Sequence, residues 1–87
     1  MKIYVLKLDL SLVMPRLKNF RLGEFNHNFP TIFIHAGDPD EACYMVYCKF
    51  TETILKQDDS KKTALLIKDI MPDVRVTKVY CKDEKKL

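Results

Sequence analysis

The sequence predicts an α+β domain, a two-layer sandwich with two helices on one face of a three- or four-stranded mixed sheet. Three observations lead to this fold class. Apolar and polar residues alternate near both ends of the chain, as they do in half-buried strands. Between these ends, apolar residues recur at helical spacing in two consecutive segments. Each of the two segments follows a residue suited to cap a helix. The expected order is strand, loop or short strand, strand, helix, helix, strand.

Length and composition predict a single domain over residues 1–87, because a chain of 87 residues supports one hydrophobic core. With 47% hydrophobic and 31% charged residues, the composition is that of a globular protein and argues against global disorder. Residues 83–87 form a short and mostly charged tail, which we expect to fray.

A first strand is expected over residues 2–10, because the even-numbered residues from Tyr4 to Leu10 are all apolar. These positions should face the core. Ile3 and Val5 on the other face are apolar too, which predicts that the strand is central in the sheet or lies against a partner. The following residues, 11–30, contain Pro15, Gly23 and Pro30 as breaks, and we expect at most a short edge strand at residues 20–25.

A strand, a turn and a helix follow one another in residues 31–58. Residues 31–36 are rich in β-branched and aromatic residues, and Gly37 allows the chain to turn. Asp38 is suited to cap a helix that begins at Pro39, with Glu41 completing a capping-box pattern. Capping explains Asp38, Asp40 and Glu41 better than a divalent-cation site does, because no calcium-loop spacing continues from them.

The long helix is amphipathic but unusually rich in apolar residues. Its expected buried face consists of Cys43, Val46, Tyr47, Phe50 and Ile54. Further apolar residues widen this face, namely Ala42, Tyr44, Met45, Cys48 and Leu55. We therefore expect a second helix or a partner to cover the additional surface.

The C-terminal third is expected to contain a helix at residues 61–71 and a strand at residues 73–82. Ser60 is suited to cap the helix, Pro72 ends it, and its buried stripe should be Leu66, Ile67 and Ile70. In the strand, simple alternation places Val74, Val76 and Tyr80 on one face, and Arg75, Thr77, Val79 and Cys81 on the other. Lys78 interrupts the first set, which indicates an edge strand or a bulge.

Residues suited to catalysis or metal binding are few. His27 and His35 are the only imidazoles, and no glycine-rich phosphate loop exists. Cys43 and Cys48 lie five residues apart on a helix and point about 140° away from each other, which disfavours a shared metal. We therefore expect a non-enzymatic protein with no cofactor and no metal.

The chain has three cysteines, Cys43, Cys48 and Cys81. Because this number is odd, we expect reduced thiols that pack in the core and a cytoplasmic protein. Residues 3–14 form an apolar run, but Lys7 and Asp9 interrupt it, and no small-residue cleavage site follows. This run is expected to be neither a signal peptide nor a membrane span.

Charge is unevenly distributed along the chain although the net charge is only +3. Residues 1–30 carry five basic and two acidic side chains, residues 31–59 carry two and six, and residues 60–87 carry eight and four. Basic segments on either side of an acidic helix attract phosphates or acidic proteins. Twelve of the fifteen basic residues are lysine, which favours diffuse attraction over bidentate recognition of bases.

This distribution favours a small accessory protein that binds RNA or single-stranded nucleic acid through a lysine and arginine surface, with Phe20 as a stacking ring. The competing interpretation of each basic cluster is a solvated segment that keeps the domain soluble. The candidate contact residues are Arg16, Lys18, Phe20, Arg21, Lys61, Lys62, Arg75 and Lys78.

The alternative hypothesis is a protein-binding inhibitor or adaptor. The wide apolar arc with Tyr44, Met45 and Leu55, together with the acidic exposed face of the long helix, is suited to a basic partner, an RNA-protein complex or a homodimer. Small, lysine-rich domains of this composition are also typical of phage-encoded antagonists of a host nuclease, toxin or defence enzyme.

Overall fold

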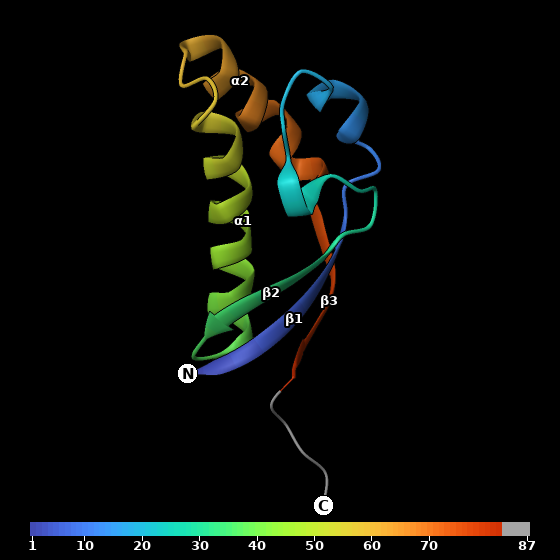
Figure 1. Ribbon diagram of the computed structural model, residues 1–87, viewed down its shortest axis with the longest axis vertical. Helices are drawn as coiled ribbons and strands as arrows, with labels where there is room; N and C mark the ends of the chain where they lie inside the picture. The colour runs from blue at the N-terminus through green and yellow to red at the C-terminus, as the bar shows by residue number, and fades with distance from the viewer. Residues whose placement is uncertain (83–87) are drawn as a thin grey trace, which may run out of the picture.

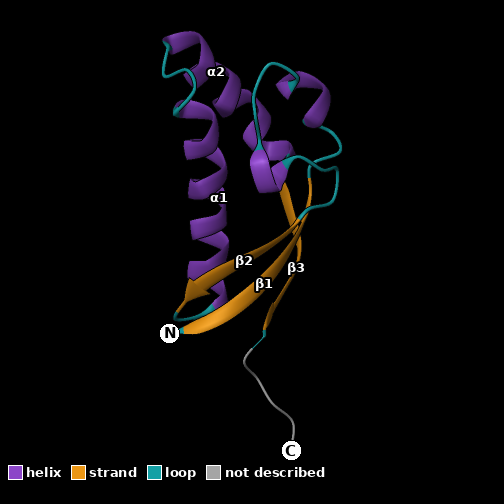
Figure 2. Cartoon of the chain, viewed as in Figure 1, coloured by secondary structure: helices purple, strands orange, loops and turns teal. Residues whose placement is uncertain are grey.

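The computed structural model describes residues 1–82, which form a three-stranded sheet and two α-helices (Figure 1; Figure 2). The strands are β1 (Lys2–Asp9), β2 (Thr31–Ala36) and β3 (Arg75–Cys81), and the helices are α1 (Pro39–Leu55) and α2 (Lys61–Ile70). Three short 3-10 turns also lie within the described residues, at Met14–Leu17 (η1), Gly23–Phe25 (η2) and Met71–Asp73 (η3). The predicted α+β fold class is confirmed, while the expected fraying of residues 83–87 lies outside the described residues.

β1 lies at the centre of the sheet between β2 and β3. Both pairs are antiparallel. Because β2 and β3 each run opposite to β1, they run in the same direction as each other, but β1 keeps them apart. The sheet of the described residues is therefore antiparallel throughout and not mixed. The central position of β1 agrees with the apolar residues on both of its faces.

The core lies between the sheet and α1, on the side of β1 that the alternation predicted. From β1 it contains Tyr4, Leu6 and Leu8, and Leu10 follows directly after the end of the strand; all four are buried. From α1 the fully buried residues are Ala42, Val46, Phe50 and Ile54. Cys43 and Tyr47 are only partly buried at the edge of this core. Figure 1 shows α1 running along one side of the sheet.

Both helix starts follow the predicted capping chemistry. The Asp38 carboxylate accepts a hydrogen bond from the Glu41 N–H at 2.8 Å, and the Glu41 carboxylate accepts one from the Gly37 N–H at 2.7 Å. The Ser60 hydroxyl accepts one from the Thr63 N–H at 3.3 Å. α2 then lies against the end of α1 and opposite η1 (Figure 1). Neither of these helices is long and apolar enough to cross a membrane.

Residues 20–25 do not form the short strand considered from the sequence. Gly23 adopts a φ of +56°, in the left-handed region, and opens the 3-10 turn η2 instead. This turn buries Phe25, whose ring packs edge-on against Phe50 with 5.3 Å between centroids. An aromatic pair of this kind anchors the segment by packing, so the segment needs no ladder hydrogen bonds to the sheet.

A β-bulge in β3 changes the two faces expected for this strand. Lys7 pairs with Lys78, while Leu8 pairs with Val76, so Thr77 is an extra residue without an opposite residue in β1. The Thr77 hydroxyl donates a hydrogen bond to the Lys7 carbonyl at 3.1 Å. The phase of the alternation shifts at this point. Val76, Val79 and Cys81 therefore share the core face, whereas Arg75, Lys78 and Tyr80 face the other way, and the simple alternation is wrong for Val79, Cys81 and Tyr80.

Candidate nucleic-acid interface

The sheet face opposite α1 carries a row of apolar side chains across all three strands. Val5 lies opposite Phe33 in β2 and opposite Tyr80 in β3. Val5 is only 3% exposed, whereas Phe33 and Tyr80 are 53% and 43% exposed. The two rings therefore shield Val5 and remain open to solvent themselves. Exposed apolar side chains that adjoin one another indicate an interaction surface more strongly than single exposed ones do.

A lysine ammonium lies close to each of these rings. Lys82 Nζ is 5.2 Å from the Phe33 ring centroid, and Lys78 Nζ is 5.3 Å from that of Tyr80. These distances are those of cation-π contacts. Together with the two further cations on this side of the sheet, these residues form what we call the aromatic-lysine face, which consists of Lys7, Phe33, Arg75, Lys78, Tyr80 and Lys82.

One carboxylate, Asp9, lies on this side of the described strands. It pairs across the ladder with Arg75. Its carboxylate accepts hydrogen bonds from the Ser11 hydroxyl at 2.6 Å and the Ser11 N–H at 2.9 Å. These bonds, and then the Arg75 charge, lower the pKa of Asp9. Asp9 is thus held at the end of β1, and the four cations give the face a positive charge.

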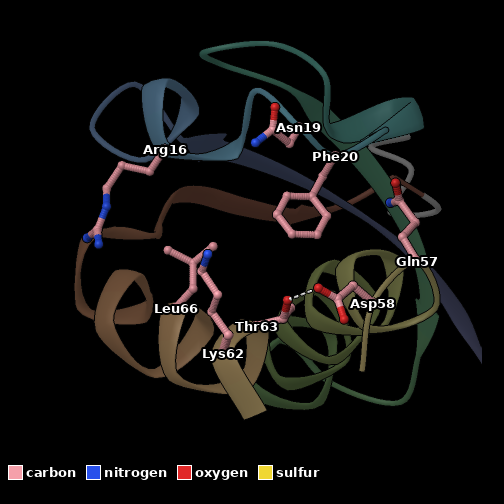
Figure 3. Close-up of a pocket in the computed structure, with 8 residues that line it drawn as sticks. All are labelled: Arg16, Asn19, Phe20, Gln57, Asp58, Lys62, Thr63 and Leu66. Carbon is pink, nitrogen blue, oxygen red and sulfur yellow. Dashed lines mark hydrogen bonds between the residues drawn. The ribbon is translucent and has the colours of Figure 1, made fainter. Parts of the chain in front are cut away.

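A second candidate is a cleft of about 440 Å³ between η1 and the start of α2 (Figure 3). Figure 3 shows the Phe20 ring pointing into this cleft, with Arg16 and Lys62 on the opposite side. The residues that line it are Arg16, Asn19, Phe20, Gln57, Asp58, Lys62, Thr63 and Leu66. The structure therefore brings together three of the eight predicted contact residues, Arg16, Phe20 and Lys62.

Several polar groups of this cleft already have partners within the protein. The Asp58 carboxylate accepts hydrogen bonds from the Thr63 hydroxyl at 2.6 Å and the Ser60 N–H at 3.0 Å. These two bonds, the Thr63 bond first, lower the pKa of Asp58. Arg16 forms an ion pair with Asp69 at 2.6 Å. The charges of the cleft are therefore largely balanced among themselves.

The polar groups of the Gln57 side chain are likewise bonded to other parts of the protein. Its side-chain carbonyl accepts a hydrogen bond from the Arg21 N–H at 2.8 Å, and its amide donates to the Arg21 carbonyl at 2.6 Å and the Thr53 carbonyl at 2.8 Å. This amide ties residues 16–25 to the end of α1. The cleft thus joins two parts of the chain, and its polar groups offer little to a ligand.

The other predicted contact residues lie apart from the cleft lining. Lys18 and Arg21 are exposed on the segment between η1 and η2, and Lys61 is exposed at the first position of α2. Arg75 and Lys78 belong to the aromatic-lysine face. The basic residues chosen from the sequence therefore occupy at least two separate surfaces.

Four residues of the aromatic-lysine face were missed from the sequence. The exposure of Phe33 could have been predicted, because alternation in residues 31–36 places it on the other face from the buried Ile32 and Ile34. The exposure of Tyr80 could not, because the bulge at Thr77 reverses its face. Lys7 and Lys82 give no signal until the pairing of β1 and β3 is known.

Thiols and imidazoles show no arrangement for chemistry in the described part of the chain. Burial, and then the charge of Asp40, raises the pKa of Cys43, which disfavours the reactive thiolate. His27 and His35 are both exposed. Within residues 1–82, no group of three or more His, Cys, Asp or Glu side chains is placed to hold a metal ion.

Comparisons with family models, curated proteins and solved structures found no match for this chain. The fold and the site therefore define its class by physical features alone, as a small α+β domain whose antiparallel sheet has one face covered by a helix and one face bearing rings and cations.

Proposed function

We propose that the protein is a non-enzymatic accessory protein that binds single-stranded RNA or DNA on the aromatic-lysine face. The observation that carries this proposal is the pair of half-exposed rings, Phe33 and Tyr80, each beside a lysine ammonium. Rings that stack with bases and cations that attract the backbone are the two components of single-strand binding without sequence preference.

The energies favour replacement of the lysine contacts by bases. A cation-π contact at an exposed site is worth about 0.5–1 kcal/mol. Stacking of a base on an aromatic side chain is worth about 1–3 kcal/mol. A base can therefore displace Lys78 or Lys82 from its ring with a net gain, and the freed ammonium is then close to the sugar-phosphate backbone.

The spacing of the rings favours an extended strand over a duplex. Phe33 and Tyr80 lie on strands separated by β1, so their backbones are about 10 Å apart, two strand spacings of about 4.8 Å. This separation suits two different bases of one strand. A duplex keeps its bases stacked on each other and exposes none of their faces, so it gains only the charge attraction.

The proposal is tested by fluorescence polarisation with labelled single-stranded RNA, single-stranded DNA and duplex probes of equal length at low salt. We expect saturable binding of the single strands, weaker binding of the duplex, and an affinity that falls with salt with a slope of about −0.7 per phosphate contact. The double variant Phe33→Ala with Tyr80→Ala should bind at least about tenfold more weakly, because two stacking rings are lost.

Two lysine variants separate the surfaces. Lys78→Ala with Lys82→Ala removes two charges from the aromatic-lysine face, and Lys61→Ala with Lys62→Ala removes two charges from the start of α2. Binding should fall much more in the first pair. Absence of saturable binding to every probe would refute the proposed function. A loss of binding confined to the Lys61 and Lys62 pair would refute the assignment of binding to the aromatic-lysine face.

A protein-binding inhibitor or adaptor is the second candidate, favoured by the exposed apolar side chains of α1. Tyr44 is 70% exposed and Met45 is 37% exposed. A pull-down from nuclease-treated lysate separates the two functions. A specific protein retained by the wild type and lost with Tyr44→Glu, combined with no binding to nucleic acid, would favour this second candidate.

A further inference from the structure

Among the residues that the structure describes, β2 is an edge strand whose outer backbone groups have no hydrogen-bond partner. Leu8 N donates to the Pro30 carbonyl at 3.0 Å, and Leu10 N donates to the Asn28 carbonyl at 2.7 Å. Hydrogen-bonded pairs recur at every second residue of an antiparallel ladder, so the even-numbered residues of β2 direct their N–H and C=O groups toward β1. The odd-numbered residues, Thr31, Phe33 and His35, therefore direct theirs away from the sheet.

This edge lacks the features that protect sheet edges from pairing. β2 has no charged residue, no proline and no bulge within its six residues. The opposite edge, β3, has the bulge at Thr77 and the cations Arg75 and Lys78, with Lys82 just beyond its end. β2 is thus suited to pair with another strand, and β3 is not.

A groove of about 430 Å³ lies between the β2 edge and α1. The residues that line it are Phe33, Ile34, His35, Tyr44, Met45, Cys48, Lys49 and Glu52. Lys49 is paired with Glu24 at 2.9 Å. The exposed apolar side chains of the groove thus adjoin the unpaired strand edge, and both would be covered by a second strand with a helix above it.

We propose that β2 pairs antiparallel with β2 of a second copy of the chain, which gives a two-fold dimer with a continuous six-stranded sheet. Charge favours a second copy as the partner, because β2 carries no charged residue and pairing it with itself brings no like charges together. Pairing of β2 with β3 of another copy is disfavoured by the bulge and cations of β3, so the assembly closes at two chains rather than growing into a fibre.

The outward groups determine the register. Residues that direct their backbone groups outward have to pair with one another, and the overlap is greatest when Phe33 lies opposite Phe33 of the second copy. Thr31 then lies opposite His35, and three hydrogen-bonded pairs exchange about six hydrogen bonds. A two-fold axis perpendicular to the sheet keeps both α1 helices on the same side, where Tyr44 and Met45 of the two copies meet.

The dimer is tested by sedimentation equilibrium of the full chain over a wide range of concentration, in reducing agent so that no Cys48 disulfide contributes. We expect a reversible monomer-dimer equilibrium. His35→Pro removes an N–H that points away from β1, so the monomer keeps its ladder. The dimer Kd should rise at least about tenfold, because one ladder hydrogen bond is lost from each copy.

His35→Ala is the matched control, since it loses the same side chain but keeps the N–H, so the Kd of His35→Pro should exceed that of His35→Ala by at least about tenfold. Tyr44→Glu provides a second variant that does not touch the sheet, and it should also raise the Kd, because two carboxylates then meet across the axis. A wild type that stays monomeric at every concentration overturns the proposal, and so does a dimer that His35→Pro and Tyr44→Glu both leave intact. Neither outcome depends on whether the monomer binds nucleic acid.

Discussion

The cleft between η1 and α2 and the aromatic-lysine face differ in how their polar and aromatic groups are used. In the cleft, Gln57 and Asp58 make hydrogen bonds to the protein itself, and Arg16 is paired with Asp69. On the sheet face, Phe33 and Tyr80 flank Val5, are about half exposed to solvent, and each have a lysine ammonium near the ring. Exposed groups whose interactions are weak enough to exchange for a ligand therefore indicate a binding site better than a cleft with internally bonded groups does.

The largest effect that sharpens this comparison is expected from Phe25→Ala. Phe25 is fully buried against Phe50 and anchors the segment that forms one wall of the cleft. Its truncation should lower the free energy of unfolding by about 3–5 kcal/mol, as is usual for a buried phenylalanine. Urea unfolding followed by circular dichroism measures this loss. A loss below about 1 kcal/mol would mean that the segment does not depend on this packing.

Tyr80→Ala should have the opposite profile, with weaker binding and nearly unchanged stability. Loss of one stacking ring costs about 1–3 kcal/mol of binding free energy, which is about 5-fold to 150-fold in Kd. Tyr80→Phe keeps the ring and is the matched control. Polarisation titrations with one single-stranded probe measure all three proteins. Equal affinities of Tyr80→Ala and Tyr80→Phe would remove the stacking role of this ring.

Gln57→Ala should reduce stability but leave nucleic-acid binding unchanged. The side chain makes three hydrogen bonds to backbone groups, two of them to Arg21. Their solvent-exposed setting limits the expected loss to about 1–2 kcal/mol in urea unfolding. Gln57→Glu keeps the acceptor for the Arg21 N–H but loses the donor, so its stability should be intermediate. If folded Gln57→Ala bound nucleic acid more weakly than the wild type, the cleft would have to take part in binding.

The smallest expected effect is the pH dependence that Asp58 contributes. The hydrogen bonds from Thr63 and Ser60 lower the pKa of Asp58 below its ordinary value of 3.8. A carboxyl whose pKa is lower in the folded state stabilises the fold above its unfolded pKa, and this contribution is lost as the pH falls through the folded pKa. Wild-type stability should therefore decrease on acidification below about pH 4.

Thr63→Val is the variant that tests this assignment, because it removes the hydroxyl donor and keeps the Asp58 carboxylate. Its urea midpoint should be lower than that of the wild type at pH 7, and the difference should shrink at about pH 3. A difference that stays constant between the two pH values would show that Asp58 is not the group involved.

Much of the fold was predictable because its signals are local. The caps at Asp38 and Ser60 depend on residues three positions away, and the buried face of β1 follows from alternation within one strand. Residues 10–30 were less predictable, since packing of Phe25 on Phe50 joins residues far apart in the sequence. The candidate site was predicted only in part. Arg75 and Lys78 were named, but Phe33 and Lys7, which lie on the same face of the sheet, belong to other strands.

The sequence by itself determined the fold class, the element order, the start of each helix and the core face of β1, because each rests on the spacing of nearby residues. Only the tertiary structure decided between the two positions that the sequence left open for β1, which edge of the sheet is unprotected, and which cations share a face with the aromatic rings. The bulge at Thr77 illustrates the physical reason. Its position is set by the pairing of β1 with β3, and that pairing alone turns Tyr80 away from the core and toward Val5 and Phe33.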